Sequence, residues 1–269
     1  MADQKIRVAV NGYGVIGKRV ADAVRVQPDM ELVGVSDVVS DYRVKTAVAL
    51  GIPVFTSLPD KQNEMQAAGI PVVGTLDNLL TDVEVIVDCT PKGIAAKNID
   101  RYREAGVKSI FQGGEKHSLT GHSFVAQANY ASALGRDTTR VVSCNTTSTV
   151  RTLMALRDAG LLKKARGVLI RRATDPWESD HSGIMNTVVP EEHIPSHQGP
   201  DAQTVVPELD VVTIAAKAAH TQNHNHFWIV ELARAATREE VLAAFRAAPR
   251  IAFFRMSEGI VALNNSVEL

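Results

Sequence analysis

One cysteine of this chain has surroundings that suit nucleophilic chemistry. Cys144 lies within residues 141–147 (VVSCNTT), where an apolar, strand-like run changes to a helix-like one. A free thiol has a pKa near 8.5, and a helix N-terminus favours its reactive thiolate form. Backbone N–H groups there could also stabilise an oxyanion on an attacked carbonyl. We therefore predict that Cys144 is a nucleophile and that Cys89, at the end of an apolar run, is a small buried residue.

A cysteine nucleophile needs a partner for proton transfer, and the second half of the chain is rich in histidine. The candidates are His181, His193, His197, His220, His224 and His226. His224 and His226 open a strand-like segment and would share one of its faces, so one of them is predicted to be the general base. Solvated or structural histidines are the alternative, and His220 with His224 resembles half a zinc site. That spacing needs a helix and has no cysteine or carboxylate cluster nearby, so we predict no metal.

A glycine motif near the start of the chain is typical of dinucleotide binding. Gly12, Gly14 and Gly17 form G-x-G-x-x-G between an apolar run and an amphipathic segment. One glycine makes the tight turn, one lets a pyrophosphate approach the backbone, and one allows close helix–strand packing. Free N–H groups at the helix start would bind the anion. An ordinary turn between a strand and a helix is the alternative.

The acidic residue that follows this motif bears on the choice of cofactor. Asp37 lies 20 residues after Gly17, at the end of the second expected strand. A carboxylate there can accept both ribose hydroxyls of NAD and repels the 2′-phosphate of NADP, so NAD is favoured over NADP. In the alternative interpretation Asp37 caps a loop, and Ser36 or Arg43 meets the nucleotide instead.

The expected elements divide the chain into two domains. Residues 1–143 alternate strands and helices, which predicts an α/β domain with a parallel, doubly wound sheet. Residues 144–269 have longer loops and predict an α+β catalytic domain with a mixed or antiparallel sheet. The expected strands are 6–10, 31–36, 83–88, 107–112 and 140–143, then 167–172, 211–216, 227–232 and 251–255. The expected helices of the second domain are 147–159 and one that opens with a capping box from Thr237 to Glu240.

Composition excludes several classes of protein. The 269 residues are 45% hydrophobic, and 29 basic residues against 30 acidic ones give a net charge of −1. This balance argues against nucleic acid as the main partner, since neutralising phosphates requires basic residues in excess. No apolar run is long enough for a membrane span, and no secretory signal is visible. Two cysteines cannot form a disulfide framework, which predicts a cytoplasmic protein.

Several motifs, in order along the chain, resemble the archaeal-type (type II) phosphorylating glyceraldehyde-3-phosphate dehydrogenases. They are NGYGVIGKRVADAV (11–24), QGGEK (112–116), VVSCNTT (141–147), RRATDP (171–176), SHQGPD (196–201) and HNHFWIVEL (224–232). The match runs over essentially the whole chain. It implies a cytoplasmic homotetramer with a Rossmann-type nucleotide domain. Its reaction would oxidise D-glyceraldehyde 3-phosphate with inorganic phosphate and NAD(P) to 1,3-bisphosphoglycerate, through a cysteine thioester.

The resemblance also assigns roles to individual residues. Cys144 corresponds to the nucleophile and His224 to the general base, while Arg171 is expected to be structural because neighbours along a strand face opposite sides. The implied substrate-site residues are Ser143, Asn145, Thr146, Gln198 and Gly199. Besides the glycine motif and Asp37, the implied cofactor-binding residues are Val15, Ile16, Gly113, Gly114 and Arg172.

Some positions depart from the family pattern. Gln198 replaces a histidine, Ser148 replaces a glycine, and the chain stops where family members continue for some tens of residues, so we expect a C-terminally incomplete catalytic domain. These departures leave two alternatives. One is a related cysteine-dependent semialdehyde or acyl-phosphate dehydrogenase. The other is a non-catalytic nucleotide-binding interaction protein.

Overall fold

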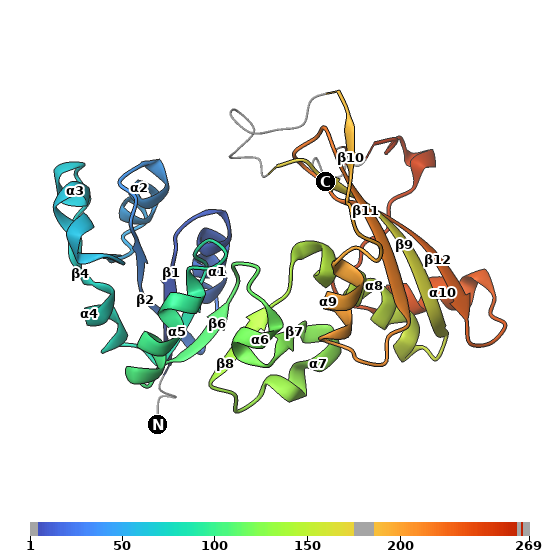
Figure 1. Ribbon diagram of the computed structural model, residues 1–269, viewed down its shortest axis with the longest axis horizontal. Coiled ribbons are helices and arrows are strands. Elements are labelled where there is room, and N and C mark those ends of the chain that lie inside the picture. Colours follow the sequence, from blue (N-terminus) through green and yellow to red (C-terminus); the bar gives the residue numbers. More distant parts are fainter. Residues whose placement is uncertain (1–4, 175–185, 263–264, 266–269) are drawn as a thin grey trace. The chain divides into compact units, whose positions relative to one another are not determined.

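The chain folds into two compact units. The computed structural model describes residues 5–174, 186–262 and 265 (Figure 1). The first unit is Met1–Phe124 with Ala131–Val142, and the second is Val125–Tyr130 with Ser143–Leu269. The chain thus passes between units at Val142 and Ser143, while the short segment 125–130 belongs with the second unit, which its sequence did not indicate.

The first unit is built on an eight-stranded sheet in which every neighbouring pair of strands is parallel. Its strand order is β4-β3-β2-β1-β5-β6-β8-β7. The strands are β1 (Ile6–Asn11), β2 (Met30–Asp37), β3 (Val54–Thr56), β4 (Val72–Thr75), β5 (Val85–Asp88), β6 (Lys108–Phe111), β7 (Ser123–Phe124) and β8 (Thr138–Val141). The strand order reverses between β1 and β5, which is the position where open α/β sheets bind ligands.

Helices cover both faces of this sheet, so its central strands are buried on both sides. Ala9 packs in one core with residues of α4 and α5, whereas Val10 packs in another with residues of α1, α2 and α3. The helical segments are α1 (Val15–Arg25), α2 (Tyr42–Ala49), η1 (Pro59–Lys61), α3 (Gln62–Ala67), α4 (Leu76–Leu80), α5 (Ala95–Glu104), α6 (His117–Thr120) and α7 (Ala126–Ala133), the last shared by both units. The predicted doubly wound fold is confirmed. The strands that the sequence missed, β3, β4 and β7, are the shortest or among the shortest.

The second unit packs helices on a four-stranded mixed sheet. Its strand order is β10-β11-β9-β12, with β9 and β11 parallel and the two outer pairs antiparallel. Helix α8 packs on β9 and against α9, and α9 packs on β11 (Figure 1). The elements are α8 (Cys144–Asp158), β9 (Leu162–Arg172), β10 (Val188–Pro190), α9 (Gln198–Gln203), β11 (Val211–Ala218), β12 (Asn225–Leu232), α10 (Arg238–Ala247) and η3 (Met256–Glu258). The mixed sheet agrees with the sequence prediction.

Local details of this unit both confirm and correct the expectations. The capping box is confirmed: Thr237 Oγ1 accepts from the Glu240 N–H, and Glu240 Oε2 accepts from the Thr237 N–H. Helix α8 begins three residues earlier than expected because Ser143 supplies its N-cap. The strand expected at 251–255 is wrong, since this stretch pairs with no strand of the described chain. It follows Pro249 and Arg250, whose φ of +61° turns the backbone away from an extended path.

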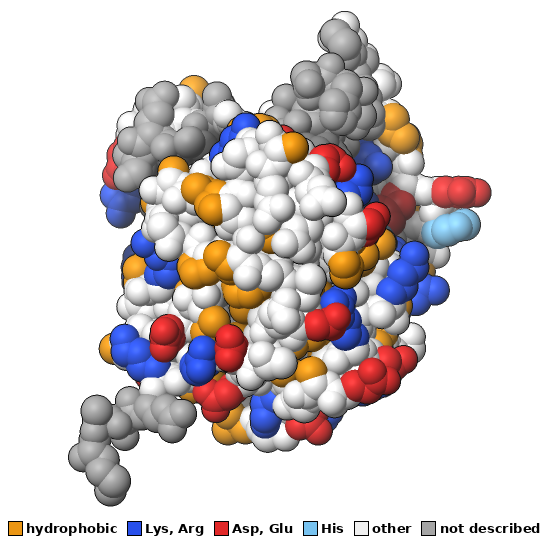
Figure 2. Space-filling view, turned by 90° about the vertical axis from the view of Figure 1, so that its left-hand side faces the viewer, with side chains coloured by type: hydrophobic (Ala, Val, Ile, Leu, Met, Phe, Trp, Pro, Cys, Tyr) orange, Lys and Arg blue, Asp and Glu red, His pale blue; other side chains and the backbone are white. Residues whose placement is uncertain are grey.

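Charged side chains of both signs are interspersed on the first unit. On the face that Figure 2 shows, basic side chains lie near acidic ones and no large patch carries a single sign of charge. Within the first unit, Arg101 pairs with Asp77 and Arg103 pairs with Asp100. Such a face lacks the basic excess that nucleic acid binding needs. No helix in the described residues is both long and apolar enough to cross a membrane.

Candidate active site

The glycine loop lies between β1 and α1, and its glycines have separate physical roles. Gly12 has a φ of +90°, a conformation that L side chains rarely adopt. A Cβ at Gly17 would lie 1.9 Å from the Gly12 carbonyl oxygen, so only glycine lets the helix pack this closely. A Cβ at Gly14 would have nothing within 4 Å. Gly14 is therefore the position where a ligand can come close to the backbone.

The first N–H groups of α1 have no hydrogen-bond partner among the described residues. Gly14 is the N-cap residue and has no side chain that could cap the helix. The backbone N–H groups of Val15, Ile16 and Gly17 precede the first bond of the helix, which Lys18 donates to the Gly14 oxygen. Val15 and Ile16 are 36% and 45% exposed, so solvent or a ligand reaches this turn. Such a terminus attracts phosphate groups.

Asp37 is held at the end of β2 by backbone donors. One oxygen accepts from the Tyr13 N–H at 2.6 Å, and the other accepts from the Val38 N–H at 2.7 Å. Asp37 thus ties the glycine loop to β2 and keeps a fixed negative charge beside it. The two alternative residues are engaged elsewhere: Ser36 is buried and donates to Asn11, and Arg43 pairs with Asp41.

Two further loops follow β5 and β6, at the same edge of the sheet as the glycine loop. A Cβ at Gly113 would lie 2.3 Å from the Thr90 carbonyl oxygen, so glycine allows these loops to touch. Glu115 adds a second tie by accepting from the Gly93 N–H at 2.6 Å. Gly114 has a φ of +79° and open space around it. The first unit therefore brings the predicted cofactor residues before Arg172 to one edge, where strand order reverses.

Cys144 occupies the first turn of α8 in the second unit. Its side chain is exposed, whereas Cys89 is largely buried, and burial raises the pKa of the Cys89 thiol. Ser143 Oγ accepts from the Thr146 N–H at 3.2 Å, and the Ser143 carbonyl accepts from Thr147. The N–H groups of Cys144 and Asn145 have no partner among the described residues, so these two can act on an oxyanion. The Thr146 N–H is not available for this, because it donates to the Ser143 cap.

His224, immediately before β12, contacts the Cys144 sulfur. Its Nε2 lies 3.2 Å from Sγ, and its Nδ1 accepts from the Arg172 backbone N–H at 3.2 Å. Because Nδ1 is an acceptor, the proton of the neutral ring belongs on Nε2, which then donates to the sulfur. Burial, followed by the charge of nearby Arg172, lowers the pKa of His224 to about 4. In this resting geometry the imidazole is neutral at pH 7.

Cys144 opens onto a pocket of about 300 Å³ with a cationic lining. Arg171, Arg172, Lys217 and His197 all line it, together with Ser143, Asn145 and Thr174. Arg171, which was expected to be structural, lines the pocket together with Arg172 at the end of β9. Parallel register places Lys217 of β11 beside Arg171. The sequence did not point to Lys217, and it indicated His197 only as a candidate for proton transfer.

One carboxylate balances part of this charge. Glu191 Oε2 accepts from Arg171 at 2.9 Å, and its Oε1 lies 2.7 Å from His197 Nδ1. Burial opposes ionisation of Glu191, but His197 and Arg171 hold its pKa below the ordinary value. The pocket nevertheless keeps a cationic excess suited to an anionic ligand, because no ion pair is seen for Lys217 among the described residues.

Other predicted residues lie away from the pocket. Gln198 is 0% exposed, and neither polar atom of its side chain has a partner among the described residues. Gly199 is buried, and its N–H donates to Thr213 Oγ1 at 3.0 Å. Thr146 is also buried, with its hydroxyl on Asp201. His181 and the last two residues of RRATDP, Asp175 and Pro176, lie outside the described residues.

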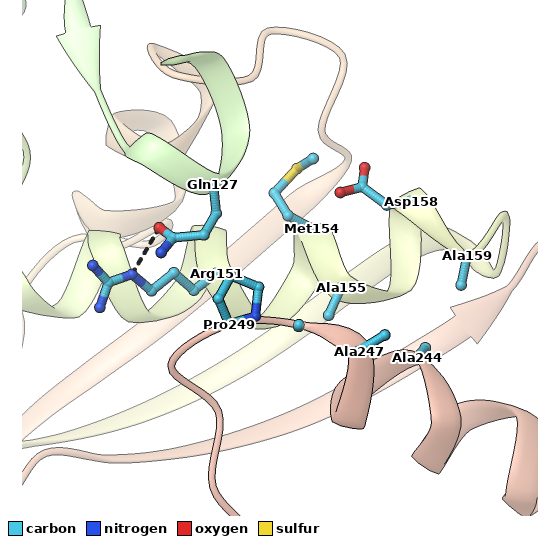
Figure 3. A pocket seen from close by; sticks show the side chains of 10 residues that line it. Gln127, Arg151, Met154, Ala155, Asp158, Ala159, Ala244, Ala247 and Pro249 are labelled. Atoms are coloured by element: carbon cyan, nitrogen blue, oxygen red, sulfur yellow. Dashed lines mark hydrogen bonds between the residues drawn. The ribbon is translucent and has the colours of Figure 1, made fainter.

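The remaining surface offers no second reactive site among the described residues. Within the described residues no cluster of three or more His, Cys, Asp or Glu side chains could hold a metal ion. A second pocket of about 310 Å³ lies between α8 and the end of α10 (Figure 3). Its lining includes Arg151, which donates to Gln127, and several alanines, but neither cysteine nor histidine. It lacks groups for nucleophilic chemistry.

Known proteins resemble this chain in both units. Residues 143–267 match the glyceraldehyde 3-phosphate dehydrogenase C-terminal domain family, and residues 6–113 match the dihydrodipicolinate reductase N-terminus family. A glyceraldehyde-3-phosphate dehydrogenase of Methanothermobacter thermautotrophicus is 44% identical over 264 residues, covering 98% of this chain and 78% of that protein. One from Thermococcus sibiricus is 48% identical over 255 residues, covering 95% and 75%. Among solved structures, aspartate semialdehyde dehydrogenase II of Vibrio cholerae, complexed with ASA, matches with a TM-score of 0.66 and 16% identity, covering 94% of this chain and 80% of that one. This likeness shows the fold alone.

Proposed function

The chain belongs to the glyceraldehyde-3-phosphate dehydrogenase family, and we propose that it oxidises D-glyceraldehyde 3-phosphate to 1,3-bisphosphoglycerate through a thioester on Cys144. The observation that carries this proposal is the contact of 3.2 Å between Cys144 Sγ and His224 Nε2 in a cationic pocket. The first unit is the nucleotide-binding domain and the second is the catalytic domain. The cytoplasmic homotetramer that the resemblance implies is part of the same proposal, and light scattering tests its oligomeric state.

The first unit fits a nicotinamide nucleotide. Space is open at Gly14, the N–H groups of α1 are unshared, and Asp37 lies at the end of the neighbouring strand. The glycine loop would hold the pyrophosphate, with Asp37 on the ribose, and Gly113 and Gly114 beside it. When bound, the nucleotide accepts the hydride that the substrate loses. The charge of Asp37 favours NAD.

The reaction begins with the thiolate of Cys144. Because the pKa of His224 is about 4, the imidazole does not keep the thiol proton, which passes to solvent. The Nε2–H of His224 and the N-terminus of α8 stabilise the anionic sulfur. The sulfur then forms a bond to the aldehyde carbon, and the carbonyl electron pair moves onto the oxygen to give a hemithioacetal oxyanion.

The oxyanion is stabilised by donors of this chain. Three donors lie at the N-terminal end of α8, beside the Cys144 sulfur. They are the backbone N–H groups of Cys144 and Asn145, which have no partner among the described residues, and the Nε2–H of His224. When the oxyanion loses hydride, its electron pair re-forms the C=O bond and leaves a thioester on Cys144. The general-base role expected of His224 would require its proton on Nδ1, where the Arg172 N–H now points. The resting geometry therefore supports a donor role.

The cationic side chains of the pocket can bind phosphate in two forms. Arg171, Arg172, Lys217 and His197 can bind the phosphate ester of the substrate or the inorganic phosphate that attacks the thioester. Attack by a phosphate oxygen forms the acyl phosphate and releases the Cys144 thiolate. This balances the reaction with no further oxidant.

An absorbance assay of nucleotide reduction tests this function. We expect turnover with D-glyceraldehyde 3-phosphate, inorganic phosphate and NAD, and loss of turnover in Cys144→Ser. Cys89→Ala is the matched control and should retain activity, because Cys89 is not among the residues that line this pocket. Full activity in Cys144→Ser, or better turnover of an unphosphorylated semialdehyde, would overturn the proposal.

A further inference from the structure

A second histidine lies behind the reacting cysteine and has no role in the chemistry described so far. His226 is in β12, two residues after His224, and its Nε2 lies 2.8 Å from Asn145 Oδ1. Its ring stands nearly perpendicular to that of Trp228, with 6.1 Å between the ring centroids. Trp228 in turn lies over Gly167 of β9, where a Cβ would come within 2.4 Å of the indole. The inner face of β12 therefore holds His226 in a fixed place.

The contacts of His226 decide which ring nitrogen carries its proton. Nδ1 is buried and has no partner among the described residues. A buried N–H without an acceptor is rarer in proteins than a buried acceptor without a donor. The proton therefore belongs on Nε2, which donates to Asn145 Oδ1. Burial lowers the pKa of His226, so the ring is neutral at pH 7.

This donor fixes the orientation of the Asn145 amide. With Oδ1 turned to His226, the Nδ2 group points toward Cys144, and it lies 3.9 Å from Sγ. The opposite tautomer would require Asn145 to flip, which would place its carbonyl oxygen toward the sulfur and bury an unpaired N–H at Nδ1. Both consequences are unfavourable when the sulfur is a thiolate.

We propose that His226 is a positioning residue, which holds the Asn145 side-chain N–H toward the Cys144 sulfur and thereby stabilises its thiolate. The inference rests on the proposed function only in taking Cys144 as the nucleophile. His226 acts through Asn145, whereas His224 touches the sulfur directly. Two neighbouring histidines thus act on one sulfur from two sides, one directly and one through an amide.

Other charged and titratable side chains also face Cys144, and they remain present when His226 is replaced. His224 contacts the sulfur, and Arg171, Arg172, Lys217 and His197 line the same pocket. They lie at the end of β9, in β11 and in nearby loops, and all of them are present in every His226 variant. His226 also contributes to lowering the pKa of His224, so the comparison with Asn145→Ala separates the link through Asn145 from this second effect.

Alkylation by iodoacetamide measures this link without substrate or cofactor. The chain has two cysteines, so Cys89→Ala leaves Cys144 as the single thiol. In this background we compare the alkylation rate from pH 5 to pH 9 for His226→Phe and His226→Gln. The phenyl ring keeps bulk without a donor, whereas a glutamine amide can still donate to Asn145. Far-UV circular dichroism and melting curves check that each variant is folded.

We expect His226→Phe to move the midpoint of the alkylation profile upward by about one pH unit, with about tenfold slower alkylation below it, as loss of one N–H bond to a charged sulfur predicts. His226→Gln should restore most of the rate. Asn145→Ala should show the same loss, and adding His226→Phe to it should cause no further change. Wild-type reactivity in His226→Phe, or additive effects in the double variant, would overturn the proposal.

A second measurement needs no substitution in the measured protein. Nitrogen-15 NMR of histidine-labelled protein distinguishes a ring protonated at Nε2 from one protonated at Nδ1, and His226→Gln assigns the signal by its absence. The proposal predicts Nε2 protonation of His226 at pH 7. A proton on Nδ1 would overturn it, even if Cys144 proves to be the nucleophile of the proposed dehydrogenase.

Discussion

Two single glycine-to-alanine substitutions in the glycine loop should have different effects. One, Gly17→Ala, should lower stability, and the other, Gly14→Ala, should weaken nucleotide binding. At Gly17 the new Cβ would lie 1.9 Å from the Gly12 carbonyl oxygen, at least 1 Å closer than real Cβ contacts allow. That oxygen belongs to a backbone segment held by the Gly12 N–H bond to Ser36, so relief requires α1 to move off the sheet. At Gly14 the methyl would meet nothing within 4 Å, and its φ of −80° is open to alanine.

The expected magnitudes follow from these contacts. Overpacking costs about 1–3 kcal/mol, and a clash with backbone belongs at the upper end. Alanine recovers up to about 1 kcal/mol of helix propensity at Gly17, so Gly17→Ala should lose about 2 kcal/mol of unfolding free energy. In a unit of this size that lowers Tm by about 4–8 °C. Gly14→Ala should stay within about 2 °C of wild type, because N-cap and chain-entropy effects are small and opposite.

Nucleotide affinity should show a different pattern in Gly14→Ala. Its methyl group occupies the space that we assign to the pyrophosphate, so calorimetric titration with NAD should give an affinity at least about tenfold weaker, a loss of about 1.4 kcal/mol. Thermal melting and calorimetry on the same preparations supply both values. Wild-type affinity in Gly14→Ala would refute the assigned approach of the pyrophosphate, and an unchanged Tm in Gly17→Ala would refute the packing argument.

Three further predictions concern cofactor choice, protonation and anion binding. Asp37→Asn keeps an acceptor for the Tyr13 N–H but removes the charge, so the ratio of kcat/KM for NAD over NADP should fall about tenfold or more; an unchanged ratio would contradict the role of Asp37. Because the pKa of His224 is about 4 in the fold against an ordinary 6.5, the unfolded chain takes up a proton first as pH falls. Denaturant titrations should therefore show that the unfolding free energy of wild type falls by about 2 kcal/mol relative to that of His224→Gln between pH 6.5 and 4, after allowance for the partial exposure of the ring. If the unfolding free energies of the two proteins instead changed equally with pH, the imidazole would not be held neutral. Lys217→Ala should raise KM for the phosphorylated aldehyde about tenfold while leaving iodoacetamide alkylation of Cys144 nearly unchanged, and equal KM values would exclude Lys217 from phosphate binding.

The nucleotide loop could be predicted from the sequence because its physical causes are local. A strand, three glycines and a helix lie within a short stretch, where close contacts explain Gly12 and Gly17, and Gly14 leaves open space. Asp37 was predicted from its spacing, and its position at the end of β2 agrees. What the sequence did not show is that Asp37 also holds the loop through the Tyr13 N–H.

The contact between Cys144 and His224 was harder to predict, since the two residues are 80 positions apart in the chain. The start of a helix indicated the cysteine, and a strand with histidines at alternate positions left His224 and His226 both open. The resemblance pointed to His224, and the fold explains the difference, because one ring reaches the sulfur and the other reaches Asn145.

The anion-binding side chains depended on sheet register, which the sequence did not specify. Arg171 and Lys217 lie opposite each other only because β9 and β11 pair in parallel with this particular offset. Gln198 was expected in the substrate site from the resemblance. It lies instead in the first turn of the short helix α9, which the sequence pattern did not predict, and this turn points its side chain into the core.

The covalent intermediate provides the most direct test of the account. Mixing the protein with D-glyceraldehyde 3-phosphate and NAD, without inorganic phosphate, should produce one reduced nucleotide per chain and then stop. Intact-mass and peptide analysis should then find one acyl group, on Cys144, which disappears when inorganic phosphate is added. An acyl group on Cys89, or nucleotide reduction that leaves every cysteine unmodified, would contradict the claim that the Cys144 sulfur carries the reaction.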